Sequence, residues 1–115
     1  MQYMLLVYVP KSDREPTPAE IQSMVTDYGA FNERIHATNA YVDGSRLAPA
    51  ASATTVRVRD GRNVITDGPF AETKEWLGGY YVVEAASLDD ALHIAADCPG
   101  AKYGSIEIRP LASAG

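Results

Sequence analysis

The amino-acid sequence predicts an α+β domain whose elements follow the order β-α-β-β-α-β with an inserted β-hairpin. Three observations support this prediction. Apolar runs of strand length recur along the chain, and between them lie two segments whose apolar residues are spaced three or four apart. Each of these segments opens on a helix-capping signal. The dipeptide Asp60-Gly61 is typical of a tight hairpin turn. Without the hairpin, this order is the ferredoxin-like split βαβ arrangement.

The first strand is expected over residues 3–9, where both faces carry apolar residues, as in a central strand covered on both sides. A long helix follows, because Thr17 and Glu20 form a capping box around Pro18 at the first helical position. The helix should end near Asn39. Its apolar stripe, expected to face the sheet, consists of Ile21, Met24, Val25, Tyr28, Phe31 and Ile35.

Five more strands and a second helix complete the domain. The hairpin strands are expected on either side of Asp60-Gly61, and the second helix begins at Ser87, which resembles a capping box with Asp90. Pro99-Gly100 should end that helix. Its expected buried face consists of Leu88, Ala91, Leu92 and Ala95. The strands are expected over residues 41–47, 53–59, 64–66 and 80–85, with a last one over 105–109.

The composition is that of one small globular domain. We assign residues 1–112 to it and residues 113–115 to a flexible tail. The net charge of −5 and the lack of a Lys/Arg run argue against nucleic-acid binding. Nothing approaches a membrane-spanning apolar stretch, and there is no signal-peptide pattern. The lone Cys98 agrees with a reducing compartment, so we expect a cytoplasmic protein that makes no contact with membranes.

The segment over residues 66–81, called here the signature segment, is too long and too rich in functional side chains for a plain connection. It opens with Asp67-Gly68-Pro69, a turn in which Gly68 supplies a positive φ. Three charged residues, Glu72, Lys74 and Glu75, follow. They either line the mouth of a pocket or pair with one another in a solvated loop.

The signature segment also carries a family resemblance. Its residues Asp67-Gly68-Pro69-Phe70-Ala71-Glu72-Thr73-Lys74-Glu75, followed by Leu77-Gly78-Gly79-Tyr80-Tyr81, resemble the signature of DGPF-domain proteins in the YCII-related family. The resemblance extends to residues 1–8, 53–60 and 104–110. It implies a dimeric α/β barrel, and it implies for some members an association with alternative sigma factors.

For the wider family, the resemblance implies a His–Asp pair in a cleft between the sheet and the helices. Asp97 matches the family aspartate, but Asp27 and Tyr28 occupy the place of the histidine, so the pair is not carried over. Tyr28 and Asp97 are the nearest candidates for acid–base chemistry, and Glu72 is a third. Tyr28 is equally suited to the core.

A homodimer is expected on physical grounds as well. Two helices on one face of an antiparallel sheet leave the other face uncovered, and the alternating Val and Tyr residues there would expose more apolar surface than a monomer usually tolerates. Pairing sheet against sheet about a twofold axis buries that surface.

The first hypothesis for function is the binding of an unidentified small molecule in a cleft between the sheet, the first helix and the signature segment. General acid–base catalysis in that cleft is a second hypothesis, and a non-catalytic dimeric regulatory or interaction module is the alternative. Asp67 is expected to be structural, with an acid–base role as the other interpretation. The expected ligand-binding residues are Tyr8, Asp67, Phe70, Lys74, Trp76 and Tyr80, with Tyr28 as a further apolar wall.

Several other residues favour structural interpretations. His36 and His93 lack the partners of a metal site, although Asp89 and Asp97 lie four residues either side of His93, so neither a metal nor a cofactor is expected. Cys98 is expected to be a small buried core residue. Arg57 and Arg59 share one strand face, where charge discourages aggregation at a sheet edge, although an anion site including Arg46 is the other interpretation.

Overall fold

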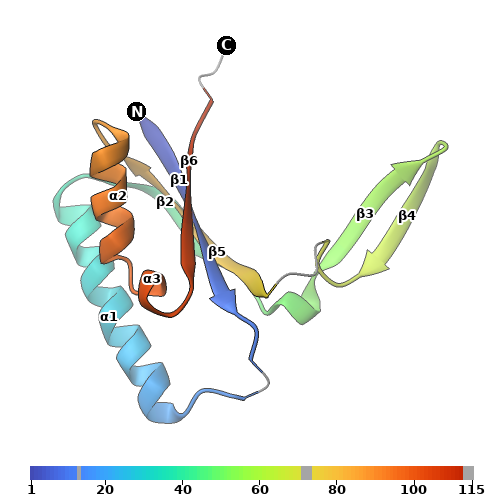
Figure 1. The fold of residues 1–115 in the computed structure, drawn as a ribbon, viewed down its shortest axis with the longest axis horizontal. Helices are drawn as coiled ribbons and strands as arrows, with labels where there is room; N and C mark the ends of the chain where they lie inside the picture. The colour runs from blue at the N-terminus through green and yellow to red at the C-terminus, as the bar shows by residue number, and fades with distance from the viewer. Residues whose placement is uncertain (13, 71–73, 113–115) are drawn as a thin grey trace.

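A four-stranded antiparallel sheet with helices packed on one of its faces forms the body of the protein. The computed structural model describes residues 1–12, 14–70 and 74–112. Within them the strand order of the large sheet is β2-β5-β1-β6, and β3 and β4 form a separate two-stranded sheet (Figure 1). The elements are β1 Gln2–Pro10, α1 Pro18–Ala37, β2 Tyr41–Arg46, η1 Ala50–Ser52, β3 Thr54–Arg59, β4 Arg62–Asp67, β5 Glu75–Glu84, α2 Leu88–Asp97, α3 Gly100–Tyr103 and β6 Ser105–Pro110.

The predicted α+β class and the predicted order of elements are both observed, with the short η1 and α3 as additions. The expected tail over residues 113–115 lies outside the described residues. Among the residues that the structure describes, no helix is long and apolar enough to span a membrane.

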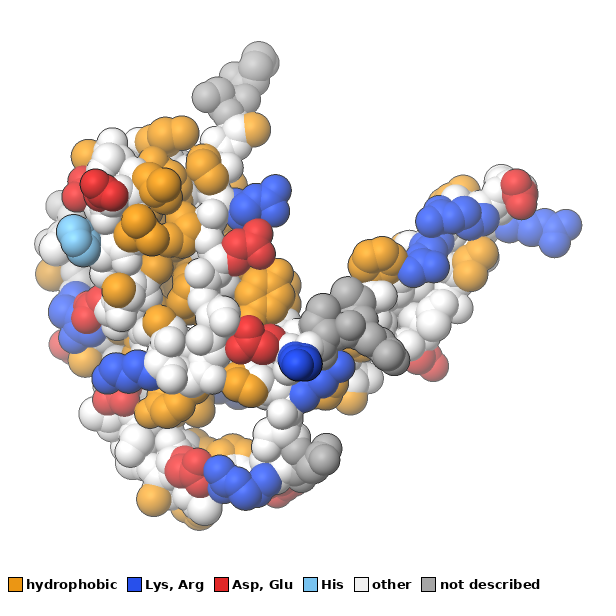
Figure 2. Space-filling model, viewed as in Figure 1, with side chains coloured by type: hydrophobic (Ala, Val, Ile, Leu, Met, Phe, Trp, Pro, Cys, Tyr) orange, Lys and Arg blue, Asp and Glu red, His pale blue; other side chains and the backbone are white. Residues whose placement is uncertain are grey.

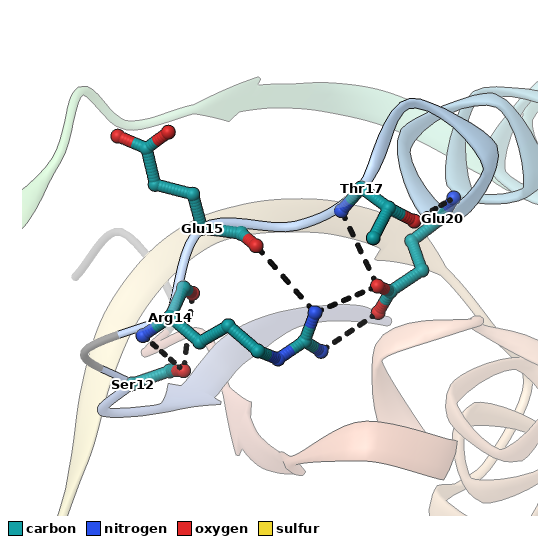
Figure 3. Close-up of polar contacts among 5 residues, drawn as sticks. All are labelled: Ser12, Arg14, Glu15, Thr17 and Glu20. Atoms are coloured by element: carbon teal, nitrogen blue, oxygen red, sulfur yellow. Dashed lines mark hydrogen bonds and ion pairs between the residues drawn. The ribbon is translucent and has the colours of Figure 1, made fainter.

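The start of α1 is set by the predicted capping box (Figure 3). The hydroxyl of Thr17 accepts the backbone N–H of Glu20, and the Glu20 carboxylate accepts the backbone N–H of Thr17, both at 3.2 Å. The guanidinium of Arg14 donates two further bonds to that carboxylate, at 2.8 and 3.0 Å. These hydrogen bonds, led by those from Arg14, lower the pKa of Glu20 to about 2.

Only half of the predicted apolar stripe of α1 faces the sheet. Phe31 and Ile35 are buried, whereas Ile21, Met24 and Val25 are exposed. The helix is longer than the surface available to it, and its first turns extend beyond α2 and α3 (Figure 1). The expectation that the whole stripe packs on the sheet is therefore wrong for these turns.

The predicted buried face of α2 is also wrong in part. Leu88 and Leu92 are exposed, and Ala91 and Ala95 are buried, with Ile94 packed beside them. The small alanines let the helix lie close against the strand residues Tyr3 and Leu5, which with Val83 form the core on this side. A second buried cluster lies under α1 and includes Phe31, whose ring meets that of Tyr81 edge-on at 5.3 Å.

Strand β5 begins earlier than predicted because Gly78 and Gly79 continue the strand through a bulge rather than interrupt it. The register with β1 shifts between Val7 and Tyr8, where Val7 pairs with Gly79 and Tyr8 with Leu77. A Cβ atom on Gly79 would lie 2.9 Å from the Ser45 carbonyl oxygen of β2. The bulge and the close backbone approach explain the pair of glycines.

The face of the sheet turned away from the helices is apolar along the two central strands, β1 and β5, and polar at its edges, where Glu107 and Arg109 of β6 and Asp43 of β2 lie. Paired residues on neighbouring strands share a face, so Leu6 lies beside Tyr80 and Met4 beside Val82. The surface that these residues form, together with Tyr8, is called the open sheet face. Figure 1 shows α1, α2 and α3 on the other side of the sheet.

The β3–β4 hairpin, called the arm, projects away from the body (Figure 1). Its tip has the left-handed residues that the turn prediction requires, with φ of 52° at Asp60 and 74° at Gly61. At its base, the backbone N–H of Gly68 donates to the Ala53 carbonyl at 2.7 Å. The Cα radius of gyration is 16.2 Å, compared with about 13 Å for a compact domain of this length.

Candidate functional site

An ion pair joins the C-terminal turns of α1 and α2 across the seam between these helices. The Arg34 Nε donates to the Asp97 Oδ2 at 2.6 Å, and both side chains are about half exposed, at 51% and 52%. Asp97 is the last residue of α2, where a carboxylate is disfavoured by the helix dipole. The guanidinium therefore compensates a charge that α2 alone would not favour.

A groove of about 490 Å³ runs along the same seam. Phe31, Ile35 and Ile94 make its floor apolar, and Arg34 and Asp97 stand at its rim. The complete lining consists of Phe31, Arg34, Ile35, Thr38, His93, Ile94, Ala96 and Asp97. Figure 2 shows acidic, basic and histidine side chains gathered over α1 and α2 on this side of the molecule. The groove thus combines an apolar base with groups that carry charge or transfer protons.

His93 lies one helical turn before Asp97 on α2, and both line the groove. His93 is exposed. On the other side of the ion pair lies a smaller hollow of about 150 Å³, also bounded by Arg34 and Asp97 and flanked by Asp27 and Lys102. The ion pair therefore separates two hollows along one seam.

Beneath the seam lie three weakly acidic side chains that stay protonated at neutral pH. Burial raises the pKa of the Tyr28 phenol and of the Cys98 thiol, and it raises the pKa of Tyr81 to about 12. The Tyr81 hydroxyl donates to the Asn32 Oδ1 at 3.0 Å. Tyr28 is therefore suited to donate a hydrogen bond and not to act as a base. The prediction that Cys98 is a small buried core residue is confirmed.

The predicted ligand-binding residues do not meet in one cleft of the protomer. Tyr8 and Tyr80 lie on the open sheet face, and Tyr28 lies on the helix side, beside the second core cluster. Trp76 pairs with Val9 and shares the helix side with it, because strand side chains alternate. Within the signature segment, the bulge at Gly78 therefore places Trp76 and Tyr80 on opposite faces of the sheet.

Trp76 has two unusual features. Its indole Nε1 is buried and has no hydrogen-bond partner among the described residues. The Lys11 ammonium lies 5.1 Å from the centre of its ring. Lys11 also donates its backbone N–H to the Lys74 carbonyl at 3.1 Å, which ties the signature segment to the end of β1.

The remaining signature residues lie near the arm or outside the described residues. Phe70 is 71% exposed and lies against the Arg57 guanidinium, 4.8 Å from its ring centre. Asp67 is the last residue of β4 and pairs with Thr54. Lys74 is exposed. Glu72, the third catalytic candidate, falls in residues 71–73, which the structure does not describe.

Sequence reasoning selected Asp97 but missed Arg34. The signal available in the sequence was a carboxylate at the end of a helix, a position that calls for a cation. The identity of that cation depends on the packing of α1 beside α2, because 63 positions separate the two residues. Within the described parts of the chain, the structure shows no group of three or more His, Cys, Asp or Glu side chains arranged to bind a metal ion.

Comparisons with known proteins place the chain in a family. A model of the YCII-related domain matches residues 1–113. An uncharacterized protein of Rhizobium meliloti (strain 1021) is 38% identical over 118 residues, which cover 97% of this chain and 93% of the relative. Among solved structures, the 5-chloro-2-hydroxyhydroquinone dehydrochlorinase (TftG) of Burkholderia phenoliruptrix AC1100, in complex with 2,5-dihydroxybenzoquinone, matches with a TM-score of 0.48. That match has 16% identity over 97% of this chain and 94% of the other, a level too low to support an inference about fold or chemistry.

Proposed function

Because the chain belongs to the YCII-related family, we propose that it is a cytoplasmic homodimer that binds a small molecule in the groove between α1 and α2. The observation that carries this proposal is the Arg34–Asp97 ion pair standing over an apolar floor. Small-molecule sites combine apolar walls with a few placed polar groups, which is the composition of this groove.

The ligand that suits the groove has an apolar body and one acidic group. Among the described residues, the Arg34 guanidinium uses only its Nε in a hydrogen bond, so its terminal nitrogens are available to an anion. The apolar body of the ligand would lie over Phe31 and Ile94. An anionic group at Arg34 would also compete with Asp97 and release its carboxylate.

The groove also holds groups for proton transfer. His93 carries an imidazole, the side chain best suited to exchange protons near neutral pH, and Asp97 on the next turn is placed to orient or neutralise it. General acid–base catalysis by these two residues is the reaction chemistry that we propose. Tyr28, protonated beneath the seam, supports the packing and takes no proton in this scheme.

The homodimer is proposed from the exposed surface. The chain exposes 8334 Å², compared with about 6,100 Å² for a folded monomer of its 12.4 kDa mass. The excess is more than the roughly 800 Å² that each partner buries in a standard interface. We propose that two ferredoxin-like units pair their open sheet faces, with Leu6 and Tyr80 near the twofold axis, to form a dimeric α/β barrel.

Binding in the groove can be tested with benzoate, an aromatic ring bearing one carboxylate. Titration of isotope-labelled protein followed by NMR is expected to shift the signals of Arg34, His93 and Ile94. Arg34→Ala should weaken binding at least tenfold, and Arg46→Ala, which removes an exposed arginine of β2, should leave it unchanged. Shifts confined to Trp76 and Tyr80 would instead assign the site to the signature segment.

A non-catalytic dimeric module is the second candidate, and one observation favours it. None of the described residues of the signature segment lines the groove. Glu75, Leu77 and Tyr80 instead lie on β5, on the side of the open sheet face, and Phe70 lies at the base of the arm. In this alternative the signature is architectural. A panel of small aromatic acids that leaves the melting temperature of the dimer unchanged would favour the module.

A further inference from the structure

We propose that the arm is an interaction surface that docks onto a second copy of this chain. The inference rests on the homodimer proposed above and goes beyond the pairing of sheets. Its starting observation is that the arm has two chemically different faces. Val56 lies opposite Ile65 on one face, and Arg57 lies opposite Val64 on the other.

The first of these faces, called the apolar arm face, is formed by Val56, Val58 and Ile65. These side chains are 62%, 61% and 66% exposed in the protomer. A two-stranded hairpin with no further packing is at best marginally stable in water. We therefore expect the large β-branched side chains that this hairpin exposes to solvent to be buried against another surface in the assembled protein.

The arm accounts for the extended form of the chain. It projects from the side of the sheet opposite the helices, so the arm and the open sheet face border the same space (Figure 1). A second copy that pairs with the open sheet face would enter this space and meet the arm. The excess of about 2,200 Å² over a compact monomer is large enough for sheet and arm together.

The charge of the arm complements that of a second copy of this chain. The arm carries three arginines and two aspartates, whereas the remainder of the chain has 7 Lys and Arg against 13 Asp and Glu. Figure 2 shows the basic side chains gathered along the arm. Arg59 and Arg62 face each other directly in the register, an arrangement of like charges that costs stability unless an anionic surface lies near. The acidic body of a second protomer supplies such a surface.

Two neighbouring residues of β4 provide a matched test. Ile65→Asp places a charge on the apolar arm face, and Thr66→Asp places the same charge one residue along, on the arginine face. Sedimentation velocity over a dilution series measures the dissociation constant of the dimer. We expect Ile65→Asp to raise it at least 100-fold and Thr66→Asp to change it less than threefold. Val58→Asp, on the apolar arm face near the tip, should act like Ile65→Asp.

Leu6→Asp, on the open sheet face, separates this inference from the dimer proposal. If Leu6→Asp dissociates the dimer but Ile65→Asp and Val58→Asp do not, the arm docking is wrong and the sheet pairing stands. A wild-type chain that remains monomeric at micromolar concentration would overturn both.

Hydrogen exchange of the wild-type protein decides the matter without any substitution, in case the arm variants do not fold. The amides of the arm should be protected from exchange in the dimer, and their protection factors should fall at least tenfold when the protein is diluted to the monomer. Arm amides that exchange equally fast at every concentration would overturn the docking.

Discussion

The asymmetry between the two partners of the Arg34–Asp97 ion pair gives a prediction that separates binding from stability. In the Asp97→Asn variant the ion pair is lost, which costs about 0.2–1 kcal/mol for a pair this exposed. The same change removes a negative charge from the C-terminus of α2, which returns about 0.3–1 kcal/mol. The two effects nearly cancel, so the free energy of unfolding should change by less than about 0.5 kcal/mol.

The Arg34→Ala variant should behave differently. It loses the same ion pair, leaves Asp97 unpaired at the end of α2, and removes a cation from the last turn of α1, where the helix dipole favours one. Together these losses amount to about 0.5–2 kcal/mol. Such a difference would show that the Asp97 carboxylate contributes little to the stability of the fold, and it would leave the groove as the place where this side chain acts.

Urea unfolding followed by circular dichroism measures the free energy of unfolding of both variants. All samples are kept at one protein concentration, because dimerisation contributes to the apparent stability. The double variant completes a cycle from which we expect a coupling energy of about 0.2–1 kcal/mol between the two side chains. A loss of more than about 2 kcal/mol in Asp97→Asn would refute this reasoning and make Asp97 a structural residue.

Three further predictions concern the fold. Glu20→Gln should lower the melting temperature at pH 7. Because the folded-state pKa of Glu20 is depressed to about 2 from its usual 4.5, the deficit relative to wild type should shrink as the pH falls from 4.5 to 2, and a pH-independent deficit would contradict this origin. Gly29→Ala should stabilise the exposed helix by about 0.5–1 kcal/mol, since nothing lies within 4 Å of the new methyl group. Gly79→Ala should destabilise the fold by about 1–3 kcal/mol, because the new methyl group would clash with the β2 backbone. Urea unfolding measures both changes, and equal effects would contradict this difference in packing. Cys98 should react with a thiol reagent at pH 8 at least about 100-fold more slowly in the folded protein than in urea, because burial raises its pKa and blocks access, and comparable rates would show that it is not buried.

Local signals in the sequence predicted the parts of the fold that depend on neighbouring residues. The capping box at Thr17 and Glu20 fixed the start of α1, and Asp60-Gly61 fixed the tip of the arm, because both signals act within four residues. Gly29, in contrast, has open space around it on α1, and nothing in the helical pattern near it indicates how far the sheet extends.

The errors arose where tertiary packing selects between local alternatives. Two apolar stripes of α2 share Ala91 and Ala95, and the helical period alone cannot decide whether Leu92 or Ile94 is turned to the sheet. The bulge at Gly78 hid the true start of β5, since a glycine pair usually marks a break in a strand.

The candidate site was predictable only in part for the same reason. Asp97 stood out from its position at a helix end, but its partner Arg34 is brought to it by the packing of two helices. Trp76 and Tyr80 are only four residues apart in the signature segment, but the bulge at Gly78 shifts the alternation of β5 and places them on opposite faces. Proximity along the chain was therefore a poor guide to a shared cleft.

Small-angle X-ray scattering over a concentration series tests the central claim most directly, because the open sheet face and the arm both require a second copy. We expect a molecular mass of twice 12.4 kDa at micromolar concentration, together with a scattering profile of a compact particle. A mass of 12.4 kDa at every concentration, with a radius of gyration near 16 Å, would contradict it.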